Sequence, residues 1–114
     1  MIHNGIDIVK IDRFDKLKDN KKFMDNTFNI NELKYIHSRN NDTATIAGLY
    51  AAKEAFLKAL KKGIEFCPLK DIEISHSSNN APSIIFHNDF DINNISLSIS
   101  HDGEYAIAMV SFIK

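Results

Sequence analysis

The sequence predicts an α+β fold in which an N-terminal strand and short helices precede one long helix and a run of antiparallel strands. Two patterns carry this prediction: a long helical pattern in the middle of the chain, and alternation of apolar with polar residues toward its C-terminal end. Helical and strand segments that are grouped along a chain are typical of the α+β class. The 114 residues, 44% of them hydrophobic, are enough for a single domain, residues 1–114, with one modest core.

The first part of the chain is expected to hold one strand and several short helices. Residues 2–11 are rich in Ile and Val and alternate weakly, which favours a strand. Residues 13–25 carry apolar side chains at helical spacing and predict one or two short helices. Residues 31–38 predict another short helix, whose first turn Asn29 or Asn31 can cap.

The longest helix is expected from about Thr43 to Lys62. Asp42 or Thr43 can cap its first turn through a side-chain oxygen, and Gly63 can end it in the left-handed conformation. On a helical wheel, large apolar residues fill one arc and small residues fill the opposite arc. The small residues are Gly48, Ala51, Ala52, Ala55 and Ala59. We therefore expect this helix to be buried on two sides and packed on the antiparallel sheet.

Three or four strands are expected after this helix, near residues 70–75, 83–87, 95–101 and 104–113. The last two give the clearest hairpin, because Ile and Leu alternate with Ser along the first of them. Asp102-Gly103 is a favoured two-residue turn between them. The sheet is therefore expected to be antiparallel.

Composition excludes several classes of protein. The formal net charge is −1, whereas a general nucleic-acid binder is usually strongly basic. No segment approaches the roughly 18 apolar residues that span a bilayer, and the N-terminus lacks the charged and apolar regions of a secretory signal. Cys67 is the only cysteine, so neither an intrachain disulfide nor a cysteine-based zinc site is expected. Neither nucleic acid nor membrane is an expected partner, and the expected location is the cytoplasm.

Two charged residues interrupt segments that otherwise suit a buried environment. Asp7 stands between isoleucines in the N-terminal strand, so its carboxylate must be paired, hydrated or bound to a cation. Arg13 and Lys10 are the partners that a purely structural ion pair would use. Lys53 falls near the centre of the large apolar arc of the long helix; an ordinary explanation is that its side chain extends past its neighbours to water.

Three further side chains have both a structural and a functional explanation. Glu54 and Lys58 are one helical turn apart and can form a surface ion pair. His101 ends a strand that carries alternating serines, and it stands at a turn. An imidazole and hydroxyl groups on one face of a strand can contact an anion, or they can simply meet solvent.

Three segments together carry a resemblance to a known family. They are residues 5–14 (GIDIVKIDRF), 50–60 (YAAKEAFLKAL) and 98–106 (SISHDGEYA). Their order and separation resemble bacterial holo-acyl-carrier-protein synthase, the small 4′-phosphopantetheinyl transferase. The middle segment is the most specific, and weaker matches between the three extend the resemblance over nearly the whole chain. It implies a 4′-phosphopantetheinyl transferase-like fold.

The resemblance also implies an activity. Members of that family transfer the 4′-phosphopantetheine group from coenzyme A to a serine of apo acyl carrier protein, and they release adenosine 3′,5′-bisphosphate. They require Mg²⁺ and are homotrimers with active sites between neighbouring subunits. The expected partners are therefore coenzyme A, acyl carrier protein and two further copies of the chain.

Five residues match family positions that carry the chemistry. Asp7 and Glu54 match the two positions that hold Mg²⁺, a cation that takes carboxylates together with phosphate oxygens and water. Lys53, Lys58 and His101 match positions near the coenzyme, where cations and donors suit its phosphates. Glu54 is the preferred base for the proton of the acceptor serine, directly or through a metal-bound water. Lys53 is expected to stabilise developing charge.

The remaining matches concern the nucleotide and the carrier. Gly63 and Pro82 match positions where the chain approaches the coenzyme. Arg13 matches a position that faces the carrier, and Lys21 and Lys22 match basic positions on the following segment. Since acyl carrier proteins are acidic, these three cations are the expected docking patch.

The sequence also departs from the family at positions where relatives carry a cation or a flexible residue. Leu49 and Asn26 stand where relatives often have Arg, and Asn80-Ala81-Pro82 replaces a Gly-Lys-Pro segment. These changes leave open a second function, a coenzyme A or nucleotide-binding module without transfer activity. A third alternative is a plain interaction domain in which Asp7 and Glu54 form structural ion pairs.

Overall fold

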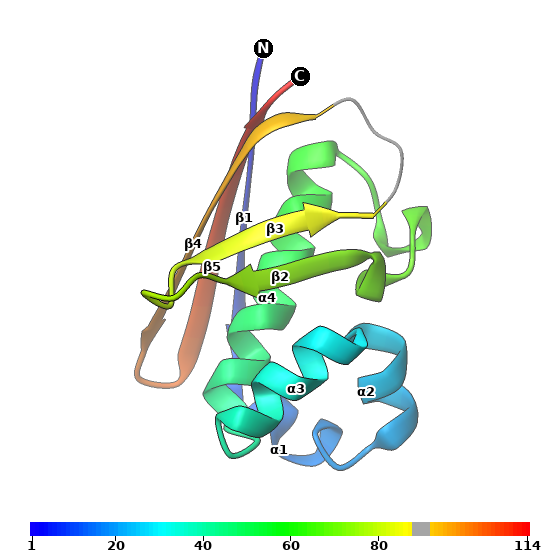
Figure 1. Ribbon diagram of the computed structural model, residues 1–114, viewed down its shortest axis with the longest axis vertical. Coiled ribbons are helices and arrows are strands. Elements are labelled where there is room, and N and C mark those ends of the chain that lie inside the picture. Colours follow the sequence, from blue (N-terminus) through cyan, green and yellow to red (C-terminus); the bar gives the residue numbers. More distant parts are fainter. Residues whose placement is uncertain (88–91) are drawn as a thin grey trace.

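The structure, a computed structural model, describes residues 1–87 and 92–114 and confirms the α+β class (Figure 1). The helices are α1 (Phe14–Leu17), α2 (Lys21–Thr27), α3 (Ile30–Ser38) and α4 (Thr43–Leu60). The strands are β1 (Ile2–Lys10), β2 (Ile72–His76), β3 (Pro82–Phe86), β4 (Asn93–Asp102) and β5 (Tyr105–Ile113). Short 3-10 turns cover Ile11–Arg13, Ile64–Phe66 and Leu69–Asp71. Within these described ranges no helix is both long and apolar enough to cross a membrane.

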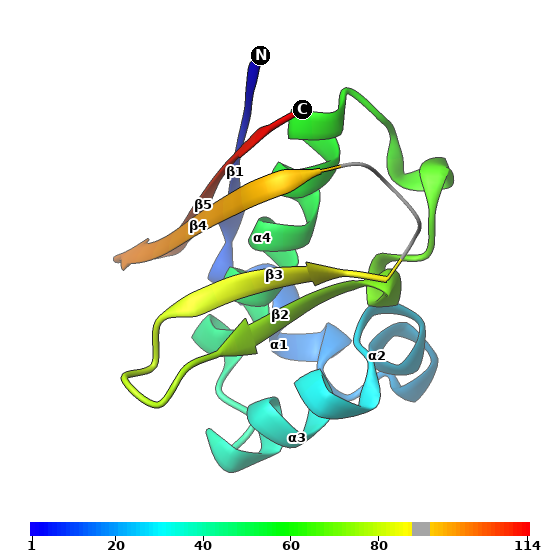
Figure 2. The ribbon, with the colours of Figure 1, turned by 45° about the horizontal axis from the view of Figure 1, so that its top comes forward.

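The strands form two antiparallel sheets (Figure 2). In the larger sheet β5 lies between β1 and β4, whereas β2 pairs with β3 in a separate two-stranded sheet. Helix α4 packs across β1 and β5, and it also contacts β2 and α1. Most of its residues are buried, which confirms the predicted two-sided burial.

The start of α4 is as predicted, but its end is not. The Asp42 carboxylate accepts a hydrogen bond from a backbone amide of the first turn. At the other end, Lys61 is the left-handed residue, with φ 58°, and Gly63 is extended, with φ −88°. The helix stops early because the amide of Lys62 already donates to the carbonyl of Leu57 and closes the last turn.

The β4–β5 hairpin turns one residue later than predicted. Asp102 and Tyr105 still pair across the ladder, so the two-residue loop consists of Gly103 and Glu104. Gly103 has φ 57°, a conformation that glycine adopts without steric cost and that suits the first position of such a loop.

Strand β1 makes its closest approach to α4 at Gly5. A Cβ atom on Gly5 would collide with the backbone of Ala55 and Ala59. Ala55 and Ala59, from the arc of small residues predicted for α4, therefore face this strand. Because neither side carries bulk there, the strand backbone lies directly on the helix, and Asp7, two residues further along β1, can reach charged groups of α4.

The face of the larger sheet that points away from α4 is apolar and exposed. Ile6 lies opposite Met109, and Ile8 lies opposite Ile107, across the β1–β5 ladder. Ile6, Ile8 and Met109 are 57%, 59% and 52% exposed in the isolated chain. A contiguous exposed apolar patch of this kind is typical of a surface that another protein chain covers.

Candidate active site

Asp7 and Lys58 meet where β1 crosses α4. Alternation along the strand turns Asp7 toward the helix on the same side as Gly5. Its Oδ1 lies 2.9 Å from Nζ of Lys58, and the two side chains are 13% and 56% exposed. The charge partner of Asp7 is thus Lys58, and not Arg13 or Lys10 as the purely structural explanation expected.

Glu54 precedes Lys58 by one helical turn and lies at the level of Asp7. β1 and α4 run in opposite directions (Figure 1), and two strand residues span about 6.6 Å, close to a helical turn of about 5.4 Å. Asp7 therefore lies one turn nearer the start of α4 than Gly5, which contacts Ala55 and Ala59. The strand and the helix bring the two predicted metal-binding carboxylates to the same stretch of α4.

One carboxylate oxygen of Asp7 is available to bind a cation. Oδ2 is buried and has no hydrogen-bond partner among the residues that the structure describes. A buried carboxylate oxygen without a partner is unfavourable, since it has lost water and gained nothing in return. Asp7 Oδ2 is therefore suited to a cation that approaches between β1 and α4.

The predicted placement of Lys53 beside the coenzyme, like its alternative at the surface, is wrong. The Lys53 side chain is fully buried. Its Nζ lies 2.7 Å from a Glu32 oxygen and donates to the carbonyls of Leu69, at 3.0 Å, and Ile72, at 2.6 Å. These three partners use all three ammonium protons, so no donor is left for a phosphate or a developing negative charge.

Glu32 is the centre of the network that holds Lys53. It closes a capping box with Asn29 at the start of α3, and its Oε2 accepts from the amide of Ile74, at 2.8 Å. Burial raises the pKa of Glu32 and lowers the pKa of Lys53, while each opposes the shift of the other. The pair joins α3, α4 and β2 and is a structural element of the core.

Tyr50 links Arg13 to the charged side of α4. The Arg13 guanidinium carbon lies 5.3 Å from the centre of the Tyr50 ring and 5.6 Å from that of Phe14. Burial, and then the charge of the Glu54 carboxylate, raise the pKa of Tyr50, so the hydroxyl keeps its proton. Stacking on Tyr50 and Phe14 fixes the Arg13 side chain. The other two cations of the predicted docking patch are exposed: Lys21 forms an ion pair with Asp25 at 2.6 Å, and Lys22 lies at the surface.

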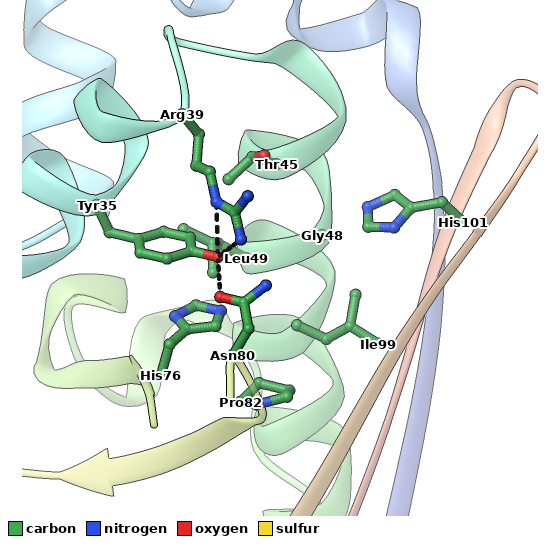
Figure 3. A pocket seen from close by; sticks show the side chains of 10 residues that line it. All are labelled: Tyr35, Arg39, Thr45, Gly48, Leu49, His76, Asn80, Pro82, Ile99 and His101. Atoms are coloured by element: carbon green, nitrogen blue, oxygen red, sulfur yellow. Dashed lines mark hydrogen bonds between the residues drawn. The ribbon is translucent and has the colours of Figure 1, made fainter. Parts of the chain in front are cut away.

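A pocket of about 290 Å³ opens beside the first half of α4, between α3, β4 and the connection from β2 to β3 (Figure 3). The rings of Tyr35 and His76 stack on one side of it, 3.8 Å apart and nearly parallel. Nε and Nη2 of Arg39 donate to the Tyr35 hydroxyl at 3.3 and 3.2 Å, and that hydroxyl donates to Asn80. Burial and the charge of Arg39 lower the pKa of His76, which keeps its ring neutral.

Two residues predicted to contact the coenzyme, Pro82 and His101, line this pocket. His101 shares a strand face with Ile99 and not with the serines, because adjacent strand residues point to opposite faces. Its Nε2 donates to the carbonyl of Ala44 at 2.9 Å, and its ring packs against Gly48. Gly63, by contrast, lies beyond the C-terminal end of α4 and does not line the pocket.

The family model described as the 4′-phosphopantetheinyl transferase superfamily matches residues 4–110. The chain belongs to the 4′-phosphopantetheinyl transferase superfamily. A holo-[acyl-carrier-protein] synthase of Caldicellulosiruptor saccharolyticus is 45% identical over 95% of this chain and 94% of that relative. The corresponding synthase of Campylobacter jejuni serotype O:2 is 44% identical over 96% of this chain and 97% of the relative.

Solved structures agree with this assignment. The Helicobacter pylori holo-[acyl-carrier-protein] synthase in complex with coenzyme A has a TM-score of 0.87 and 38% identity, over 99% of this chain and 100% of that one. The synthase from Neisseria meningitidis has a TM-score of 0.88 and 27% identity over the full length of both chains. The comparisons confirm both the resemblance seen in the sequence and the 4′-phosphopantetheinyl transferase-like fold.

Sequence reasoning missed several residues of this transferase site. Arg39 and Tyr35 carry the polar wall of the pocket, yet Arg39 falls in a polar stretch that looks like a simple break between helices. The hydroxyl of Tyr50 and the carboxylate of Glu32 were equally unrecognised. For Glu32 a signal was present: a lysine expected on an apolar helix face requires a buried carboxylate nearby.

Proposed function

We propose that this chain transfers the 4′-phosphopantetheine group from coenzyme A to a serine of apo acyl carrier protein and releases adenosine 3′,5′-bisphosphate. The ion pair of Asp7 with Lys58 where β1 crosses α4, with Glu54 one helical turn before Lys58, carries this proposal. The relatives named above are synthases of this kind, and one was solved with coenzyme A. A binding module without transfer activity would not need a buried carboxylate oxygen that has no partner among the described residues.

The residues present fit a Mg²⁺ ion. Asp7 and Glu54 would hold it, since a hard cation prefers carboxylate oxygens and Asp7 Oδ2 has no partner within the described part of the chain. Few protein ligands are expected, because Mg²⁺ keeps water and substrate phosphate oxygens in its shell. When bound, the ion would offset negative charge on the diphosphate of coenzyme A.

The chain's own residues would support the transfer in distinct ways. The acceptor serine oxygen attacks the β-phosphorus, and the bond from that phosphorus to the bridging oxygen breaks, leaving adenosine 3′,5′-bisphosphate. Glu54 would take the serine proton, and Lys58, which is exposed, would contact the diphosphate. Lys53 has no part in this step, because its ammonium is enclosed by Glu32 and two carbonyls.

The decisive test of the function is direct. Apo acyl carrier protein is incubated with this chain, coenzyme A and Mg²⁺, and the carrier is weighed by mass spectrometry. We expect a gain of one phosphopantetheine, and no gain when the acceptor serine is replaced by Ala. A carrier of unchanged mass, with coenzyme A still bound to the chain, would leave the binding module as the function.

The pocket beside α4 is proposed to bind the nucleotide end of coenzyme A. Pro82 and the Tyr35–His76 stack give it apolar and aromatic walls, Arg39 gives it donors, and His101 adds an imidazole ring. Arg39 would supply a guanidinium for the 3′-phosphate, which Leu49 cannot do. The exposed position of Arg39 leaves it free to exchange the Tyr35 hydroxyl for a phosphate.

We expect Arg39→Ala to weaken coenzyme A binding by about tenfold or more, since hydrogen bonds between charged groups are worth roughly 1.5–3 kcal/mol. Titration calorimetry with coenzyme A and with dephospho-coenzyme A, which lacks the 3′-phosphate, measures this. Arg39→Ala should bind the two ligands almost equally, while the wild type prefers coenzyme A. Lys34→Ala, an exposed cation on α3, is the control. An undiminished preference in Arg39→Ala would place the 3′-phosphate elsewhere.

Arg13, Lys21 and Lys22 are proposed to form the docking patch for the acidic carrier. Arg13 is held by Phe14 and Tyr50, so little side-chain freedom is lost when it meets a carboxylate. We expect Arg13→Gln to raise the apparent KM for the carrier severalfold and to leave coenzyme A affinity unchanged. Added salt should bring the wild type toward the variant, because exposed charges are screened beyond about 8 Å at physiological ionic strength. Carrier kinetics unaltered at low salt would move the docking surface away from α1.

The apolar outer face of the larger sheet is proposed to be the contact between copies in a homotrimer. We expect Met109→Glu to yield monomers in light scattering, since the exposed apolar side chain would be replaced by a carboxylate that the contact between copies would bury. Lys34→Glu, on the exposed face of α3, should leave the mass of the assembly unchanged. A wild-type chain that is monomeric and active at micromolar concentration would contradict sites shared between subunits.

A further inference from the structure

The ion pair between Lys58 and Asp7 lies at the same carboxylate that is proposed to hold the metal. We infer that Lys58 competes with the divalent cation for Asp7, and that coenzyme A removes this competition by drawing Lys58 to its diphosphate. This inference rests on the proposed function, because it takes Asp7 to be a metal ligand. It assigns Lys58 a second role, which is to make metal binding and coenzyme binding support each other.

The contact itself places a cation on Asp7 in the absence of any ligand. Nζ of Lys58 lies 2.9 Å from Oδ1, well inside hydrogen-bonding range, while the neighbouring Oδ2 is buried and without a partner in the described chain. The ammonium thus neutralises part of the negative charge that would attract a metal. Two cations on one carboxylate also repel each other, and the Asp7 side chain is only 13% exposed, so water screens that repulsion weakly.

The two partners differ in their freedom to move. Asp7 is fixed on a strand between Ile6 and Ile8, whereas the Lys58 side chain is 56% exposed and extends from the surface of α4. No other hydrogen bond or ion pair of the Lys58 ammonium is seen in the described residues. Lys58 can therefore leave Asp7 by rotating its own side chain, without any movement of β1 or α4.

An anion beside α4 changes this balance. The diphosphate of coenzyme A would carry negative charge within reach of Lys58 and oxygens that complete the shell of a metal on Asp7. A Lys58 drawn to the diphosphate leaves both carboxylate oxygens of Asp7 to the metal. By thermodynamic linkage, coenzyme A then raises the affinity for the metal by the same factor as the metal raises the affinity for coenzyme A.

Mn²⁺ binding, followed by electron paramagnetic resonance on the full chain without carrier protein, tests this role apart from turnover. The variant is Lys58→Met, which keeps the length of the side chain and removes its charge. Lys61→Met, an exposed lysine one turn further on, loses the same charge and is the control. Each protein is titrated with Mn²⁺ alone and with saturating coenzyme A, and Mn²⁺ with coenzyme A alone is the blank.

We expect coenzyme A to tighten Mn²⁺ binding to the wild type by about fivefold or more, a typical size for coupling between two sites. In Lys58→Met, the affinity for Mn²⁺ alone should rise by a similar factor, and the gain from coenzyme A should shrink. Lys61→Met should behave as the wild type. Part of the gain in Mn²⁺ affinity should remain in Lys58→Met, because the metal would also contact the diphosphate of coenzyme A directly.

Two results separate the failure of this inference from the failure of the metal site. If Asp7→Asn abolishes Mn²⁺ binding but Lys58→Met binds Mn²⁺ alone no more tightly than the wild type, the competition is refuted and the metal assignment stands. If Asp7→Asn binds Mn²⁺ as the wild type does, the metal assignment fails, and the role of Lys58 fails with it.

Discussion

Asp7→Asn and Glu54→Gln are each expected to reduce transfer to acyl carrier protein by about 100-fold or more. Loss of a neighbour that merely orients a metal ligand already costs up to about 100-fold, and loss of a ligand itself should exceed this. Mg²⁺ is proposed to have few protein ligands here, so neither carboxylate has a substitute. Initial rates measured over a range of Mg²⁺ concentrations give the size of the effect.

These two changes are expected to leave the fold intact, because each replaces a carboxylate with an amide of the same shape. Asp12→Asn, which removes an exposed carboxylate in the turn after β1, is the matched control and should keep wild-type turnover. Near-wild-type turnover of either site variant at limiting Mg²⁺ would show that Asp7 and Glu54 do not hold the ion.

Lys53→Met is expected to lower the free energy of unfolding by about 3–5 kcal/mol at pH 8, the usual result of leaving one charge of a buried pair uncompensated. Without Lys53, burial keeps the pKa of Glu32 above its usual value, so folding of the variant favours the protonated carboxyl group. A raised folded pKa gives stability that is present at low pH and lost as pH rises. The loss in Lys53→Met should therefore be smaller at pH 5 than at pH 8. Urea denaturation at both values measures it.

Two controls identify the cause of that loss. Lys53→Met/Glu32→Gln should be less destabilised than the sum of its two single changes, because the amide oxygen can still accept from the backbone and no charge is left buried. Lys21→Met breaks the exposed pair with Asp25 and should change stability by no more than about 1 kcal/mol. A single Lys53→Met variant as stable as the wild type at pH 8 would contradict a paired, charged Lys53.

The sequence alone predicts correctly those structural elements that depend on a local pattern of residues. Asp42 begins α4, and the two-sided burial of that helix follows from its arcs of large and small residues. The end of α4 was misplaced because glycine permits a left-handed backbone without requiring it. The β4–β5 turn was misplaced because strand pairing decides which residues form the loop. Lys61 takes that conformation in α4, and in the hairpin the pairing of Asp102 with Tyr105 moves the loop by one residue.

Local pattern identified site residues only where a residue contradicts its own surroundings, whereas Glu54, Lys58 and Pro82 were assigned from the family resemblance. Asp7 and Lys53 stood out for that reason, but the partner of each depends on tertiary contacts. Lys53 pairs with Glu32, which lies 21 residues away and whose carboxylate also caps α3. The pocket residue Arg39 contradicts nothing locally, because it sits in a polar connection, and only the pocket that forms between α3, α4 and the β2–β3 connection gives it a role.

The pairing of β1 with β5 joins the first strand of the chain to the last. During synthesis, α4 and the helices before it emerge from the ribosome well before β5, so β1 lacks its partner strand until β5 has been made. Contacts of such long sequence separation slow the closing of the core. The carboxylate of Asp7 therefore reaches its final position only late in folding, and a nascent chain that lacks β5 has no complete site with which to bind coenzyme A.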